Sequence, residues 1–193
     1  MFSLSIIALN FSIAQVTETK ILPSDPENIN SFGFSVAMDG TAMVTGCGDA
    51  NYLGPKTGVA LVFRNKNGEW VEDSILMPND WTDAARFGWS VDVQDDYLFI
   101  SSVHDGANGL WAGAVYVYKW DGIQWLEQQK LYDSNVIINI GYGICISMEE
   151  NLAIIGAPED TENGVNAGAV YIYENEGSHW NETTRLIAGN NNS

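Results

Sequence analysis

The stretch "GAVYVY" at residues 113–118 carries no charged side chain, and it returns almost unchanged as "GAVYIY" at residues 168–173. An antiparallel strand with one solvated face alternates apolar and polar residues. The absence of alternation therefore predicts a strand that is covered on both faces. Because the stretch occurs twice, this doubly covered strand must be built more than once.

The repeat extends well beyond this hexamer, and its period is 55 residues. A third version of the hexamer, "GVALVF", lies at 58–63. An aromatic-glycine pair, a tryptophan and a leucine keep the same interval without insertion or deletion. They begin at positions 32, 87 and 142, at 70, 125 and 180, and at 76, 131 and 186, respectively. Self-similarity at a fixed period of this length is typical of repeat architectures.

Each copy contains four runs rich in β-branched and aromatic residues, separated by turn signals. The first two runs, such as "FGFSVAM" and "AMVTG" in the first copy, are joined by a predicted tight turn. We place that turn at Asp39-Gly40, Asp95-Asp96 and Glu149-Glu150. A polar, glycine-rich loop leads to the third run, which is the hexamer. The fourth run starts at the repeated tryptophan and ends at the repeated leucine.

Four short antiparallel strands in a unit of about 50 residues are the signature of a β-propeller blade. We therefore predict an all-β fold of three tandem four-stranded blades, in which neighbouring blades cover both faces of each sheet. The predicted organisation is a signal peptide at 1–14, a strand and linker at 15–31, and blades at 32–86, 87–141 and 142–193, the last with a C-terminal tail.

Residues 2–14 are apolar but too short to span a bilayer. Ser12 and Ala14 provide the small side chains that a cleavage site before Gln15 requires, although the basic region typical of a signal peptide is missing. The alternative is that residues 3–8 form a degenerate strand one repeat before the first copy. No later segment is long and apolar enough to cross a membrane, so we expect no membrane insertion.

These motifs resemble the FG-GAP repeat family, whose members include the β-propellers of integrin α subunits. The matching residues are "FGFSVA" at 32–37, "FGWSV" at 87–91, "IIGAP" at 154–158 and the hexamer with its following tryptophan. The GAP half is degenerate in the first two copies, where the sequence reads Gly46-Cys47-Gly48 and Ser101-Ser102-Val103. The resemblance implies a secreted or cell-surface recognition or adhesion module, although a fold alone does not fix a function.

Integrin-like blades often carry a calcium loop between their first two strands. In this chain the connection is a tight turn, which cannot wrap the six to eight oxygen ligands that calcium requires. The acidic residues of these turns are therefore interpreted as solvated, and we predict no metal or other cofactor.

The excess of acidic over basic side chains argues against polyanionic partners. The chain has 193 residues, 8 basic and 25 acidic side chains, and a formal net charge of −17. A nucleic-acid site needs a basic stripe, so nucleic acid is excluded as a partner. The two cysteines, Cys47 and Cys145, are expected to be buried free thiols, with a disulfide between them as the alternative.

A catalytic role is weighed and rejected. Gly33-Phe34-Ser35-Val36-Ala37 resembles a nucleophile elbow, but no helix follows it and the same slot recurs in every copy. The two histidines, His104 and His179, lie 75 residues apart and in no metal-ligand pattern. We expect that the chain is not an enzyme.

The blade order places the longer and more variable loops on one face, at 48–57, 103–112 and 158–167 inside blades and at 77–86 and 132–141 between them. Loops that vary on a constant scaffold are the usual binding surface of repeat proteins. Trp81 and Trp111 fall on this face and are not repeated, so they are candidates for stacking on a sugar or a protein. The alternative is that both fill a gap between the first two blades. Weaker candidates are Tyr52, His104, Asp105, Asp160 and Glu162.

We therefore predict a non-catalytic recognition module that binds a protein or glycan on the long-loop face. The sequons at Asn181 and Asn191 predict glycosylation if the chain is secreted by a eukaryote. Three blades leave two end faces uncovered, which predicts association, for example of two chains in a six-bladed ring. The alternatives are a structural self-assembly unit and the accessory propeller of a hydrolase.

Overall fold

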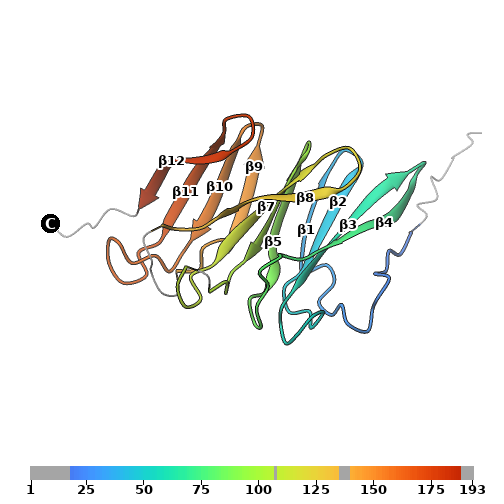
Figure 1. The fold of residues 1–193 in the computed structure, drawn as a ribbon, viewed down its shortest axis with the longest axis horizontal. Helices are drawn as coiled ribbons and strands as arrows, with labels where there is room; N and C mark the ends of the chain where they lie inside the picture. Colours follow the sequence, from blue (N-terminus) through green and yellow to red (C-terminus); the bar gives the residue numbers. More distant parts are fainter. Residues whose placement is uncertain (1–17, 107, 135–139, 188–193) are drawn as a thin grey trace, which may run out of the picture.

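The computed structural model describes residues 18–106, 108–134 and 140–187, which form twelve strands in three sheets (Figure 1). Blade 1 contains β1 (Ser35–Asp39), β2 (Ala42–Cys47), β3 (Val59–Lys66) and β4 (Glu69–Leu76). Blade 2 contains β5 (Phe87–Gln94), β6 (Tyr97–Ser102), β7 (Ala114–Trp120) and β8 (Trp125–Leu131). Blade 3 contains β9 (Cys145–Glu149), β10 (Leu152–Ala157), β11 (Ala169–Asn175) and β12 (Trp180–Ile187).

Every sheet is an antiparallel meander in which each strand pairs with the next along the chain. The three sheets stand side by side along the long axis of the molecule, as propeller-like blades do (Figure 1). The predicted all-β fold of three four-stranded blades is therefore confirmed. Within the described residues there is no helix, and hence none that could cross a membrane.

The tight turns lie where the period places them, with a small correction to the predicted residues. The paired ends Asp39 and Ala42 leave a two-residue turn at 40–41, and the equivalent turns lie at 95–96 and 150–151. The prediction was right for blade 2 and one residue early in blades 1 and 3. The first turn residue has positive φ in each case, which Gly40 adopts without strain and which Asp95 and Glu150 also adopt.

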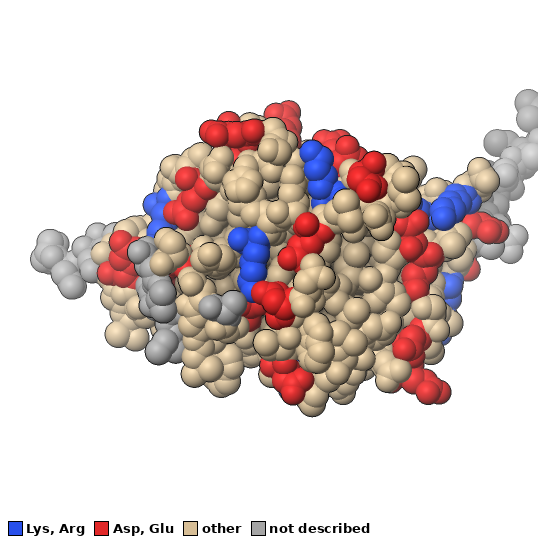
Figure 2. All heavy atoms as spheres, in the orientation of Figure 1, with Lys and Arg blue, Asp and Glu red and all other residues tan. Residues whose placement is uncertain are grey.

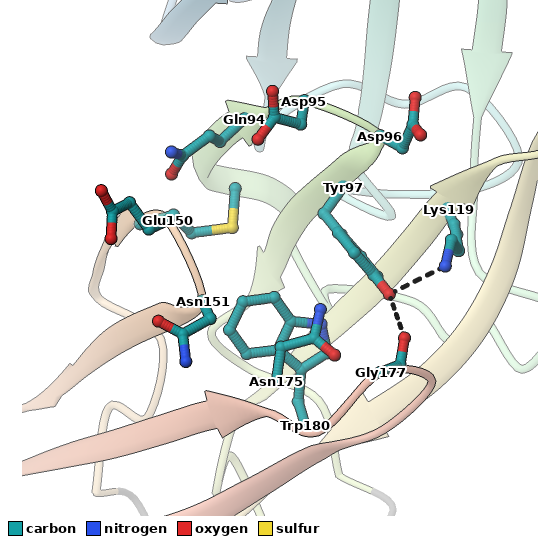
Figure 3. A pocket seen from close by; sticks show the side chains of 11 residues that line it. Gln94, Asp95, Asp96, Tyr97, Lys119, Glu150, Asn151, Asn175, Gly177 and Trp180 are labelled. Atoms are coloured by element: carbon teal, nitrogen blue, oxygen red, sulfur yellow. Dashed lines mark hydrogen bonds between the residues drawn. The ribbon is translucent and has the colours of Figure 1, made fainter.

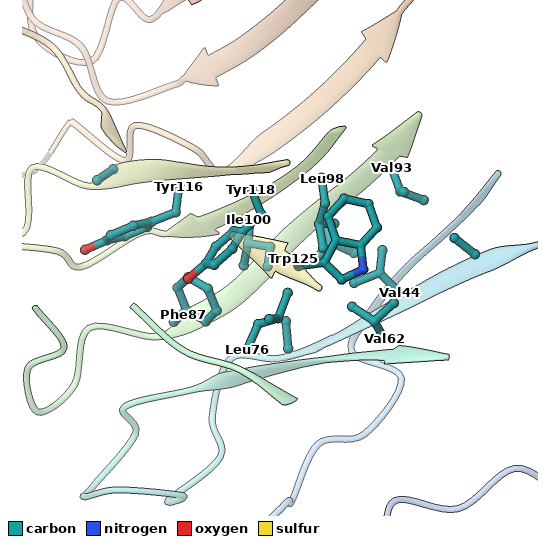
Figure 4. Packing of buried hydrophobic residues seen from close by; sticks show 14 residues of the cluster. Val44, Val62, Leu76, Phe87, Val93, Leu98, Ile100, Tyr116, Tyr118 and Trp125 are labelled. Atoms are coloured by element: carbon teal, nitrogen blue, oxygen red, sulfur yellow. The ribbon is translucent and has the colours of Figure 1, made fainter. Parts of the chain in front are cut away.

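The hexamer of blade 2 is covered on both faces, as its lack of alternation predicted. In β7, Tyr116 and Tyr118 belong to the core between blades 1 and 2, whereas Val115 and Val117 belong to the core between blades 2 and 3. All four side chains are buried. Figure 4 shows Tyr116 and Tyr118 with Phe87 and Leu76 in the first of these cores.

The glycine that opens the hexamer is required by the close approach of successive blades. At Gly58 a side-chain Cβ would lie 2.0 Å from the carbonyl oxygen of Phe87, and at Gly113 it would lie 2.3 Å from that of Tyr142. Both glycines also have positive φ. Any other residue would push the neighbouring blade away, which explains why this glycine keeps the repeat interval.

Hydrogen bonds between main chain and side chain also join successive blades, at their first strands and the turns that follow them. The amide of Asp95 donates to Asp39, and the amide of Met148 donates to Asp92. The hydroxyl of Ser35, which begins β1 in the slot that resembles a nucleophile elbow, donates to the carbonyl of Gly88. In this structure Ser35 therefore links blade 1 to blade 2.

The two end faces of the array differ. On blade 1, Leu61 and Phe63 are buried beneath Ile29, and Phe32 packs against the same cluster. On blade 3, by contrast, the apolar side chains of the outward face remain exposed. They are Ile144, Leu152, Ile154, Val170 and Leu186. We call this surface the open face of blade 3.

The cysteines are both free, so the disulfide alternative is wrong. Cys47 is buried, as predicted, but Cys145 is exposed. The prediction of a second buried thiol fails because Cys145 lies in the first strand of blade 3, beside the open face, which none of the described residues covers.

Candidate functional site

The long loops gather on one face of the molecule, at the end of the blades opposite the tight turns (Figure 1). The linker from blade 1 to blade 2 is fixed there by its main chain. The amide of Ala84 donates to the carbonyl of Pro55, and that of Arg86 donates to the carbonyl of Lys56. The amide of His104 in the next loop donates to the carbonyl of Ala85, so loop, linker and loop form one continuous surface.

Blade 2 carries a charged cluster beneath this surface, and the predicted site residue Asp105 belongs to it. The ammonium of Lys130 lies 2.7 Å from Asp80 and 2.9 Å from Asp105. The hydroxyl oxygen of Tyr116 lies 2.7 Å from each of the same two carboxylates. Burial alone would raise the pKa of Asp80, but hydrogen bonds from Lys130 and Tyr116, with the charge of Lys130, hold it below its ordinary value.

Blade 3 repeats the cluster with arginine in place of lysine. The guanidinium of Arg185 pairs with Asp160 and Asp133, and its Nη1 lies 2.7 Å from Glu162. The Tyr171 hydroxyl lies 2.8 Å from Asp133 and 3.2 Å from Asp160. Burial opposes the charge of Arg185, but Tyr171 and the two aspartates raise its pKa above the ordinary value.

Blade 1 has apolar residues at the same three positions. Ala50, Leu61 and Ile75 stand one period before Asp105, Tyr116 and Lys130, and they pack beneath the N-terminal segment. In blades 2 and 3, by contrast, the charged cluster ties a loop to the third and fourth strands of the same blade.

Asp105 and Asp160, two of the predicted contact residues, lie inside the fold. Asp160 is fully buried and Asp105 nearly so, because their carboxylates bond to the cluster. Both carboxylates neutralise internal cations, and a ligand-binding role for either residue stays a prediction. Glu162 is different: it closes the rim of the cluster, and half of its side chain is exposed.

The exposed part of the long-loop face is aromatic. Trp81 is 43% exposed and Trp111 is 49% exposed, so neither is a buried plug between blades. The ring of His104 stacks on that of Trp111, with a centroid separation of 5.5 Å and an interplanar angle of 26°. Burial and the charge of Arg86 lower the pKa of His104, which keeps the imidazole neutral at physiological pH. Tyr52 lies apart from this pair, packed against the core of blade 1.

The remaining predicted positions carry less information. Asn181 is the second residue of β12 and is half-buried, and its side-chain amide donates to Glu176. Asn191 and the predicted signal peptide lie outside the described residues. In the described part of the chain, no three acidic, histidine or cysteine side chains are arranged to hold a metal ion.

A cavity of about 450 Å³ lies on the opposite face, between blades 2 and 3 (Figure 3). Its base includes Tyr97, Lys119, Asn175 and Trp180. The Tyr97 hydroxyl accepts a hydrogen bond from Lys119 and donates one to the carbonyl of Gly177. Its rim is acidic and comes from the tight turns, namely Asp95, Asp96 and Glu150.

Comparison with known proteins decides the family. The model of the FG-GAP repeat matches the sequence three times, over residues 16–63, 70–118 and 125–173. The chain belongs to the FG-GAP repeat family. No curated protein matches the sequence.

A solved structure with a similar fold is that of Saccharomyces cerevisiae Sqt1. The TM-score is 0.52 at 15% sequence identity, over 83% of this chain and 36% of the Sqt1 chain. This FG-GAP chain therefore spans about a third of that structure. At this identity the likeness concerns the fold alone.

The FG-GAP match is out of phase with the blades by one strand. The second match, 70–118, includes β4 of blade 1 and β5–β7 of blade 2. The first match begins at residue 16, so residues 18–31 stand where a fourth strand and a linker would stand. Contacts follow the same phase: Ser24 bonds to Glu72 as Asn79, one period later, bonds to Glu127.

Sequence reasoning missed the cavity because it assigned ligand binding to the variable loops. The signal for it was nevertheless present. Position 120 is a tryptophan in blade 2, whereas the matching position 175 is an asparagine in blade 3. The matching position of blade 1 is also an asparagine, Asn65, so a large ring stands at the first junction alone and its absence at the second indicates a space there.

Proposed function

We propose that this FG-GAP chain is a non-catalytic recognition module, displayed outside the cell, that binds a protein or a glycan on its long-loop face. The exposed stack of His104 on Trp111 carries the proposal. Large, rigid aromatic surfaces that remain partly exposed are typical contact residues at interfaces. The neutral imidazole keeps the pair free of the charge that would oppose desolvation. Cell-surface display rests on the family, whose repeats occur in extracellular proteins.

The acidic surface favours partners that are neutral or basic. Figure 2 shows Asp and Glu side chains spread over the visible face, with few Lys or Arg between them. A formal charge of −17 repels polyanions and accelerates association with basic partners. The predicted ligand is therefore a neutral or basic protein surface, or an uncharged glycan.

The test is a binding screen of the purified chain against immobilised extracellular-matrix proteins and a glycan array. For any ligand found, Trp111→Ala and Trp81→Ala are compared with Ile123→Ser, which alters an exposed side chain of the β7–β8 hairpin turn. A hot-spot tryptophan contributes about 2 kcal/mol or more, so affinity should fall roughly 30-fold. Equal affinity in all four proteins, or hydrolysis of the bound ligand, would refute the proposal.

A second candidate is assembly through the open face of blade 3. The equivalent side of blade 2 is buried by blade 3, with Phe99, Val115 and Val117 in the shared core. On blade 3 the same positions, Ile154, Val170 and Ile172, face outward without a following blade. A second copy could supply that blade, and two such junctions would close a ring of six if residues 18–32 left the outward face of blade 1.

Light scattering on a sizing column tests this assembly. A dimer that Ile154→Glu converts to a monomer would support it, because a buried carboxylate opposes association. A monomer at all concentrations would contradict the ring and assign the open face to another partner. Folding of the variant is checked by circular dichroism.

A further inference from the structure

The two junctions between blades are built from equivalent positions but are filled differently. At the junction of blades 1 and 2, the indole of Trp120 packs against the guanidinium of Arg64 and against a second indole, Trp125, and Arg64 lies over both rings. The guanidinium carbon of Arg64 is 3.6 Å from the centre of the Trp120 ring, and the Trp125 ring centre is 5.6 Å away. The chain thus shows one complete example of a ring held in this place.

At the junction of blades 2 and 3 the cation and the second indole are retained, and the ring of Trp120 has no counterpart. Lys119 replaces Arg64, Trp180 replaces Trp125, and Asn175 replaces Trp120. All three replacements line the cavity of about 450 Å³ (Figure 3). The cavity therefore includes the place that an indole occupies at the other junction.

Polar atoms of the cavity lining that have no hydrogen-bond partner indicate which hydrogen-bonding group the occupant carries. Among the described residues, Asn175 Oδ1 and Gln94 Oε1 are buried acceptors without a hydrogen-bond donor. Trp180 is 2% exposed and its Nε1 also has no partner. Trp125 Nε1 is likewise unpartnered at the filled junction, so the two amide oxygens are what distinguish the cavity. Buried polar groups without partners are unfavourable, and a donor on the occupant would satisfy the acceptors.

The rim restricts the charge of the occupant. Asp95, Asp96 and Glu150 surround the opening, and Lys119 is the one basic side chain among the lining residues. Lys119 also bonds to Tyr97, which leaves the acidic groups at the entrance for an incoming cation. An anionic ligand is therefore disfavoured, whereas a positive charge beside the ring would be attracted.

We propose that this cavity binds a tryptophan side chain of a partner polypeptide that carries basic residues beside it. The indole packs against Lys119 and Trp180, as Trp120 packs against Arg64 and Trp125. Its N–H is the donor for the Asn175 or Gln94 oxygen, and the flanking basic residues pair with the acidic rim. This site lies on the face opposite Trp111, so it is additional to the recognition surface proposed above and does not rest on it.

The probe is a blocked tripeptide of lysine, tryptophan and lysine, and the control peptide has alanine in place of tryptophan. Binding is followed through the side-chain amide signals of Asn175 and Gln94 in a ¹⁵N-labelled sample, together with Tm. We expect saturable shifts of these signals and a Tm increase of about 2–4 °C with the tryptophan peptide. The alanine peptide should produce neither effect.

Two reciprocal variants test whether the cavity is the place of the missing ring. Asn175→Trp should fill it from within, abolish peptide binding and raise the Tm of the free protein. Trp120→Asn should lower the Tm and open an equivalent space beside Arg64, so that the tryptophan peptide restores more Tm in this variant than in the native chain. Trp111→Ala, on the opposite face, should bind the peptide like the native chain.

Several outcomes would overturn the proposal. Absence of Asn175 shifts in the native chain would do so, and so would undiminished binding by the Asn175→Trp variant. Stronger shifts with lactose than with the tryptophan peptide would assign the cavity to carbohydrate instead. If the Asn175→Trp variant does not fold, Asn175→Phe provides the same test with a smaller ring.

Discussion

Blades 1 and 3 stand at the two ends of the same array, and their outward faces differ in how far other residues cover them. The face of blade 1 is covered over β3, because residues 18–32 bring Ile29 and Phe32 onto Leu61 and Phe63, whereas Val36 and Met38 of β1 stay exposed on the same face. The face of blade 3 keeps Ile154 and its apolar neighbours exposed. The repeat specifies apolar residues on both sides of every blade, whatever its place in the array. The cover of an end blade comes from segments outside the repeat, such as residues 18–32, which do not share its pattern.

The largest difference in stability between blades 3 and 1 is expected at the Arg185 cluster, on the side of blade 3 that faces blade 2. Arg185→Ala leaves the buried carboxylates of Asp160 and Asp133 without their cation, so we expect unfolding free energy to fall by about 3–5 kcal/mol. Ile75→Val, at the matching position of blade 1, should cost about 0.5–1.5 kcal/mol. Urea unfolding followed by circular dichroism measures both. Equal losses would show that the Arg185 cluster is not a structural tie.

A second experiment compares the two outward faces directly. Ile29→Ala removes a side chain that is 3% exposed, so it should cost about 2–5 kcal/mol of unfolding free energy. Ile154→Ala shortens a side chain that is 45% exposed and should change the stability of the monomer by about 0.5 kcal/mol or less. A similar loss in both variants would mean that the open face is covered in solution.

The smallest effect is a difference in thiol labelling that leaves stability unchanged. Burial raises the pKa of Cys47 to about 12, although a backbone hydrogen bond at Gly33 partly opposes this, so its thiol stays protonated and unreactive. Cys145 is exposed beside the open face. A thiol reagent at pH 8 should modify Cys145 alone in the native chain and both cysteines in urea. Protection of Cys145 that disappears on dilution would instead reveal a second molecule on that face.

Much of the fold was readable from the sequence because packing between blades imposes a strict interval. The hexamer of β7 predicted two covers, and Tyr116 and Val117 indeed face different neighbours. The candidate site was less predictable. Asp105 and Asp160 resembled surface ligands, since nothing in a linear sequence shows that Lys130 and Arg185 turn inward to meet them. The cavity was missed for the related reason that the asparagine at 175 gains meaning only beside the filled junction at Trp120.

The offset between family repeat and blade has a practical consequence for dividing the chain. A fragment cut at the ends of one matched repeat, 70–118, would contain three strands of blade 2 and one strand of blade 1. It would therefore expose the hydrogen-bonding edges of two incomplete sheets. Truncations and fusions meant to fold should follow the boundaries near residues 32, 87 and 142. Each hairpin that joins a third strand to a fourth therefore crosses from one family repeat into the next, so that every blade is completed by residues of the following repeat.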